Sequence, residues 1–255
     1  MPNQLMLSLI SGIFISGAAA YLGTIMLSKK MTVVTDPLGH LALPGAALAM
    51  IYGFNLSLGA FPFVILGIFI IWLLELKTKL PMETLTAIVF AAGIGIAFLF
   101  LPIDEAEAAL IGDISKIGFI ETIVTIVLGI AVFITVNQSY SEIMLANINE
   151  DVAKVEGINV KFYNLIYLLS VAVIVALGVN LVGGLMTAAL VAIPAAAAKN
   201  LSITLVQYRW LAIIFGIISA IVGITASTFT GLPAGPLVII TSGIIFLITI
   251  PAAKA

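Results

Sequence analysis

Long apolar stretches separated by short polar connections dominate this sequence. Nine of them are roughly 17–24 residues long, the length of an α-helix that crosses a bilayer core of about 30 Å. They occupy residues 5–27, 33–53, 56–76, 84–101, 119–136, 162–179, 182–198, 206–228 and 234–250. The pattern predicts an all-α polytopic membrane protein, a single domain over residues 1–255, with nine transmembrane helices. The seventh stretch is short and follows the sixth almost directly, so eight full spans and a half-length or re-entrant helix are the alternative.

Composition supports a protein of the cell membrane. Hydrophobic residues make up 62% of the chain and charged residues 9%, against about 25% charged in soluble domains. Residues 1–4 carry no basic group, so we expect the first apolar stretch to be a retained span rather than a cleaved signal peptide. The net charge of −2 argues against a nucleic-acid partner, and the absence of cysteine excludes disulfides and thiolate metal sites.

Basic residues predict how the chain is oriented. With the N-terminus outside and nine spans alternating, the C-terminus is cytoplasmic and only Lys116 of the basic residues falls outside. The cytoplasmic ones are Lys29, Lys30, Lys77, Lys79, Lys154, Lys161, Lys199, Arg209 and Lys254. This is the asymmetry that the positive-inside rule describes. Merging the sixth and seventh stretches would place the last three of these residues on mixed sides, which favours nine spans.

Two polar connections are long enough to carry a function. The outer one, residues 102–118, contains Asp104, Glu105, Glu107 and Asp113 around a short apolar run. It is expected to form a small surface helix that contacts a partner or the outer gate, or else an acidic solvated loop.

The inner polar connection contains a pattern typical of a short capped helix at residues 149–157. It begins with Asn149, places acidic residues in the first turn and ends at Gly157. A short helix on the cytoplasmic face suits contact with a motor protein. The alternative is an ordinary interfacial helix.

One pair of residues carries candidate metal chemistry. His40 is the only histidine and Asp36 precedes it by four residues, so one helix would place both on the same face. Ionisable groups within spans are costly and commonly functional, and nitrogen and oxygen ligands suit Zn²⁺, Mn²⁺ or Fe²⁺. Pro44 cannot bond to the His40 carbonyl, so we expect a kink in the pathway there and a free oxygen.

The same residues also have a purely structural interpretation. Asp36 followed by Pro37 is typical of a helix start, with aspartate as the cap and proline at the first position. Asp36 would then only cap, and His40 would be a core histidine. Small residues follow at Ala42, Gly45 and Ala46 and predict a seam of closely packed helices. No phosphate-binding loop occurs in the sequence, so this chain is not expected to bind ATP by that route.

Five segments in order along the chain resemble the ABC-type zinc/manganese/iron permease family. Asp36, His40, Pro44 and Gly45 resemble its second span. The others are Leu-Ile-Gly-Asp-Ile at 110–114, Asp151 with Ala153, Gly157 and Ile158, the Val-Gly to Pro-Ala-Ala stretch within 182–198, and Leu-Pro-Ala-Gly-Pro at 232–236. The chain departs from the family at Pro37, Gly39 and Gly231, where a small residue, serine and often an acid are usual.

The resemblance implies a permease subunit without cofactor or enzymatic activity of its own. Two copies would form the pathway for the metal, two ATP-hydrolysing subunits would dock at Asp151, Ala153 and Gly157, and an extracytoplasmic binding protein would deliver the ion. Because a transition metal takes about four ligands, we expect Asp36 and His40 of both copies to meet on a two-fold axis. Ala42, Gly45 and Ala46 would let the two copies approach.

Two other functions are compatible with the same residues. A stand-alone secondary transporter would use Asp36 and His40 as a proton relay, although the docking helix argues against it. An intramembrane hydrolase would need a third metal ligand and a nucleophile motif, which the sequence does not provide. The residues do not distinguish Zn²⁺ from Mn²⁺ or Fe²⁺.

Overall fold

The computed structural model describes residues 2–28, 41–54, 56–78, 80–100, 117–183 and 186–253. In these ranges the chain is helical and contains no strand. The elements are α1 (Pro2–Ser28), α3 (Leu43–Tyr52), α4 (Leu56–Lys77), α5 (Met82–Phe100), α7 (Phe119–Gln138), α8 (Tyr140–Ile148), α9 (Glu150–Val155), α10 (Val160–Val182), α11 (Thr187–Leu201), α12 (Leu205–Thr230), α13 (Ala234–Thr249) and the 3₁₀ turn η2 (Ile250–Ala252).

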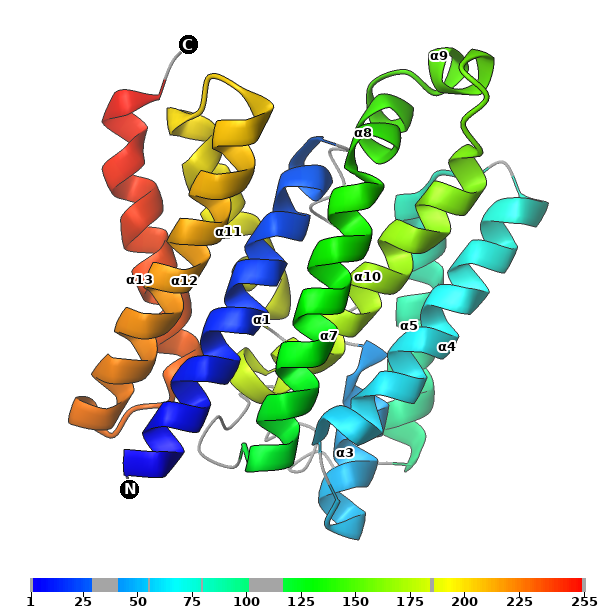
Figure 1. Cartoon of the computed structure of the whole chain (residues 1–255). Helices are drawn as coiled ribbons and strands as arrows, with labels where there is room; N and C mark the ends of the chain where they lie inside the picture. Colours follow the sequence, from blue (N-terminus) through cyan, green and yellow to red (C-terminus); the bar gives the residue numbers. More distant parts are fainter. Residues whose placement is uncertain are drawn as a thin grey trace.

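Helix α1 is the centre of the bundle. It packs against α7, α10, α11 and α12, while α13 packs on α11 and α12 at one side (Figure 1). Helices α3, α4 and α5 form a group at the other side, joined to the rest by the contact of α4 with α10 (Figure 1). Side chains of α1 such as Ala19, Ala20 and Ile25 are fully buried. Apolar side chains also cover the outer surface of the bundle, where Leu66 and Ile130 are exposed, as expected for helices surrounded by lipid.

The prediction of nine transmembrane helices, or eight to nine, is wrong. Within the described residues six helices are long and apolar enough to cross a membrane: those starting at Gln4, Ser57, Phe119, Val160, Leu205 and Ala234. Two shorter apolar helices accompany them, at Thr84–Gly95 and Thr187–Leu201. The described part of the second apolar stretch forms only the ten-residue α3.

Apolar runs overestimate the number of crossings for a physical reason. Hydropathy records the character of the side chains and not the length of the helix or its surroundings. Helix α11 has 15 residues, or about 22 Å at 1.5 Å per residue. Its Ala195, Ala197 and Ala198 are fully buried, so its apolar character serves helix packing instead of contact with lipid.

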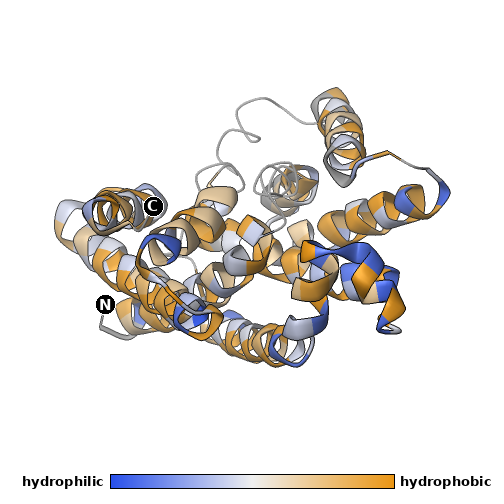
Figure 2. Cartoon of the chain, turned by 90° about the horizontal axis from the view of Figure 1, so that it is seen from above, coloured by the Kyte–Doolittle hydropathy of each residue, from blue (hydrophilic) through white to orange (hydrophobic). Residues whose placement is uncertain are grey.

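Basic side chains gather at one end of the bundle. Lys77 ends α4, Lys154 lies on α9, Lys161 and Arg209 lie near the starts of α10 and α12, and Lys199 is in the last turn of α11. All of these helix ends lie at the upper end in Figure 1. Seen from above in Figure 2, the helix walls are mostly orange and the strongest blue lies in turns at this end. Which end faces the cytoplasm stays a prediction.

Candidate functional site

The predicted metal pair lies outside the described residues, as do the acidic side chains of the outer connection. This holds for Asp36 and His40, and for Asp104, Glu105, Glu107 and Asp113. Their roles stay predictions. Across the described ranges, no three His, Cys, Asp or Glu side chains lie close enough together to hold a metal ion.

Pro44 lies in the first turn of α3, and residues 29–40 lie outside the described part of the chain. The described helix starts at Leu43 with Ala42 as its cap, and the Ala46 amide donates to the Ala42 carbonyl at 2.9 Å. A proline at this position removes no bond within α3. The predicted kink and the free His40 carbonyl involve residues outside the described part of the chain, so they stay predictions. Pro44 borders an apolar cavity of about 310 Å³ between α3, α4 and α5. The side chains that line this cavity provide no metal ligand.

The predicted seam of small residues exists, but within one chain. A Cβ atom added to Gly45 would lie 2.0 Å from the Gly59 carbonyl oxygen of α4, and one added to Gly59 would lie 2.1 Å from the Gly45 carbonyl oxygen. Ala42 and Ala46 are fully buried beside them. These residues bring α3 and α4 of one chain together. Their role in the approach of two copies stays a prediction.

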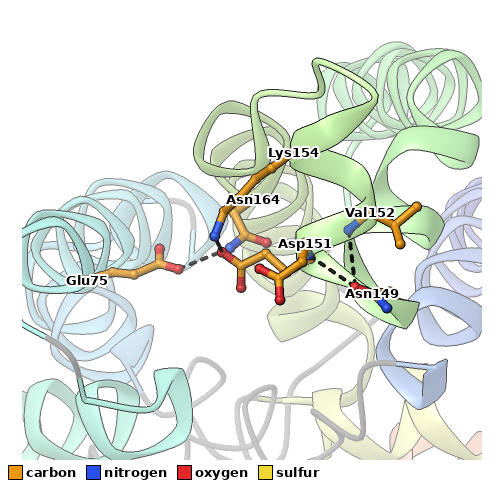
Figure 3. A network of polar contacts seen from close by, with 7 residues as sticks. Glu75, Asn149, Asp151, Val152, Lys154 and Asn164 are labelled. Atoms are coloured by element: carbon orange, nitrogen blue, oxygen red, sulfur yellow. Dashed lines mark hydrogen bonds and ion pairs between the residues drawn. The ribbon is translucent and has the colours of Figure 1, made fainter.

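Helix α9 has the start that the sequence predicts. Asn149 Oδ1 accepts hydrogen bonds from the backbone N–H groups of Asp151 and Val152, both at 3.1 Å (Figure 3). This cap satisfies two amides that have no partner inside the helix. The Glu150 carboxylate pairs with Lys154 Nζ at 2.8 Å and raises the pKa of Lys154. Acidic residues in the first turn also suit the helix dipole.

The end of α9 depends on Gly157. Its φ of +79° lies in the left-handed region that favours glycine. This geometry lets the Gly157 amide donate to the Lys154 carbonyl at 3.1 Å and the Ile158 amide to the Ala153 carbonyl at 2.9 Å. The chain then turns into α10, whose start Asn159 caps through its bond from the Phe162 amide.

One side of α9 faces the protein and the other faces solvent. Ala153 is fully buried, because α9 packs there on α8 and α10. Ile148, Val152 and Val155 are 73%, 45% and 88% exposed. Helix α9 lies beyond the ends of the long helices (Figure 1), so these apolar side chains are not placed to contact the lipid core. Ile148 is the last residue of α8 and directly precedes the cap of α9. We call these three side chains together the apolar face of α9.

Sequence reasoning missed this apolar face and stressed Asp151, Ala153 and Gly157. The structure assigns the last two a role in shaping the helix, while Asp151 is exposed and gives its amide to the cap. The sequence feature that indicates this face is the presence of three branched apolar residues, Ile148, Val152 and Val155, within the polar inner connection. Near α9, the Asn164 side chain of α10 donates to Glu75 Oε1 of α4 at 3.0 Å (Figure 3), which ties α10 to α4 below the turn.

Comparison with known proteins finds relatives over nearly the whole chain. The sequence model of the ABC 3 transport family matches residues 1–253. The chain is 26% identical over 245 residues to the manganese transport system membrane protein MntC of Listeria monocytogenes, covering 94% of this chain and 88% of that protein. It is 29% identical over 249 residues to the high-affinity zinc uptake system membrane protein ZnuB of Haemophilus influenzae, covering 95% of each.

A solved structure shares the fold. PsaBC from Streptococcus pneumoniae, in complex with Fab, superposes with a TM-score of 0.81 at 22% sequence identity. The match covers 96% of this chain and 90% of that chain.

Proposed function

Because the chain belongs to the ABC 3 transport family, we propose that it is the membrane-spanning permease subunit of an ATP-binding-cassette importer for a divalent transition metal. The single observation that carries this proposal is the family match over residues 1–253. The resemblance inferred from five short motifs is thereby confirmed. The long apolar helices are those of a subunit that crosses the membrane. The capped helix α9 lies beyond their ends, where a partner outside the membrane can contact it (Figure 1).

The cargo follows from the relatives. MntC is named for manganese transport and ZnuB for zinc uptake, and this chain is about equally similar to both. We assign Mn²⁺ and Zn²⁺ as the candidate cargo ions. Asp36 and His40 are the residues proposed to hold the passing ion, because an imidazole and a carboxylate suit both metals.

The apolar face of α9 is the proposed docking site for the ATP-hydrolysing subunit. Exposed apolar side chains on a polar, extramembrane helix favour contact with another protein. Burial of Ala153 fixes the helix on α8 and α10, so a partner pressing on this face moves α8 as well. The full importer would contain two copies of this chain, two ATPase subunits and an extracytoplasmic metal-binding protein.

Co-purification of the ATPase tests the docking site. Val155→Glu places a charge in the centre of the proposed contact and should reduce the recovery of the ATPase with this chain by about tenfold or more, the scale of a hot-spot loss. Phe229→Glu is the matched control, because Phe229 is also 88% exposed but lies at the other end of the bundle, near the end of α12. Equal ATPase recovery from both variants would contradict the proposal.

A further inference from the structure

The Arg209 side chain of α12 contacts one residue on each side of the junction between α7 and α8. We call its contacts with Tyr140 and Asn137 the clamp. The Arg209 guanidinium carbon lies 4.5 Å from the centroid of the Tyr140 ring, within the range of a cation–π contact. Arg209 Nη1 also donates to Asn137 Oδ1 at 3.4 Å. Tyr140 is the first residue of α8 and Asn137 belongs to the last turn of α7, so one side chain touches both sides of the junction.

Helix α1 contacts the same two residues. The Tyr21 hydroxyl donates to Asn137 Oδ1 at 3.3 Å, and its ring stacks on Tyr140 with centroids 5.8 Å apart and 16° between the ring planes. Tyr21 is 1% exposed and Tyr140 4% exposed. Three helices far apart in the sequence therefore meet on Asn137 and Tyr140.

The junction is a short, stiff connection to α9. Only Ser139 separates α7 from α8, and backbone hydrogen bonds continue across it: the Ser139 amide donates to the Thr135 carbonyl and the Ile143 amide to the Ser139 carbonyl. Helix α8 has nine residues and leads directly to Asn149, the cap of α9. A displacement of α9 therefore reaches Tyr140 through one rigid helix.

The helices that carry Arg209 and Tyr21, α12 and α1, pack against each other at the centre of the bundle. Helices α1 and α12 touch so closely that a Cβ added to Gly216 would lie 2.5 Å from the Ser16 carbonyl oxygen. Arg209 and Tyr21 thus belong to one packed pair of helices. Among the described residues no carboxylate pairs with Arg209, and its buried Nε has no hydrogen-bond partner.

We propose that Arg209 is a positioning residue that transmits the movement of α8 and α9 to α1 and α12, through its contact with the Tyr140 ring. The inference rests on the proposed function, in which α9 receives the ATPase. Without the clamp, the ATPase still binds and hydrolyses ATP, but its motion does not reach the helices that form the pathway. The predicted defect is one of coupling.

The test uses the complete importer in proteoliposomes, with this chain, its ATPase and its metal-binding protein. Metal imported per ATP hydrolysed is measured together with ATPase recovery, basal hydrolysis and thermal stability. Arg209→Gln and Tyr140→Leu should each lower the metal-to-ATP ratio by about tenfold, on the scale of a desolvated cation–π contact, at unchanged ATPase recovery. The double variant should be no worse than either single variant, because each variant alone already removes the Arg209–Tyr140 contact that transmits the movement.

Two variants separate transmission from structural support. Tyr140→Phe keeps the ring and should retain the wild-type ratio. Lys199→Gln removes another cation near the same end of the bundle and should also leave the ratio unchanged. A wild-type ratio in Arg209→Gln, loss of the ATPase from it, or additive losses in the double variant would each overturn the inference. Absence of ATP-dependent import by the wild-type complex would instead refute the proposed function.

Discussion

At the scale of single residues, the metal pair is the sharpest hypothesis. Asparagine caps a helix as well as aspartate does but has no carboxylate, so Asp36→Asn separates the two interpretations of Asp36. If Asp36 holds the passing ion, Asp36→Asn and His40→Ala both abolish metal uptake by the assembled importer. Uptake that survives in Asp36→Asn but fails in Asp36→Ala would identify Asp36 as a helix cap and no ligand.

Gly45 offers a second test at this scale. Gly45→Ala puts a methyl group against the Gly59 carbonyl, 2.0 Å away before any shift, so α3 and α4 must separate. We expect a loss of stability of about 1–3 kcal/mol, typical of overpacking, measured as a lower midpoint of thermal unfolding in detergent. Gly243→Ala is the matched control, because nothing lies within 4 Å of its added Cβ. An equal midpoint for the two variants would contradict the close contact of α3 with α4.

At the scale of elements, α9 shows which local features the sequence predicts. The cap at Asn149 and the left-handed Gly157 follow from residues within a few positions of each other, and both are confirmed. The side of α9 that is buried depends on where α8 and α10 lie, which its six residues do not encode. The sequence therefore suggested Ala153 for docking, although the exposed apolar side chains are those of Ile148, Val152 and Val155.

Helix α9 can be tested by its buried residue. Ala153→Leu forces a larger side chain between α9 and its neighbours, at a cost of about 1–3 kcal/mol, and should displace α9 and weaken ATPase binding while the bundle stays folded. Glu156→Leu adds the same side chain at an exposed position of the adjoining turn and should keep ATPase binding. ATPase titration of both variants gives the comparison. Normal ATPase binding by Ala153→Leu would contradict the claim that this binding depends on how α9 packs on α8 and α10.

At the scale of the whole molecule, the sequence predicts the class of protein but not the number of crossings. Composition and apolar runs place the chain in a membrane, and motifs in order along the chain identify its family. They do not distinguish a span from a buried helix such as α11, because both are apolar. Arg209 and Asn137 are 72 residues apart in the sequence, so their contact follows only from the packing of α7 against its neighbours.

The central claim is that this chain imports a metal at the expense of ATP hydrolysed by a partner. The most direct measurement is Mn²⁺ and Zn²⁺ uptake into proteoliposomes that contain this chain, its ATPase and its metal-binding protein. Uptake should require ATP and should stop when the ATPase carries a substitution that prevents hydrolysis. Metal uptake by this chain alone, driven by a proton gradient and indifferent to ATP, would contradict the account and identify a secondary transporter.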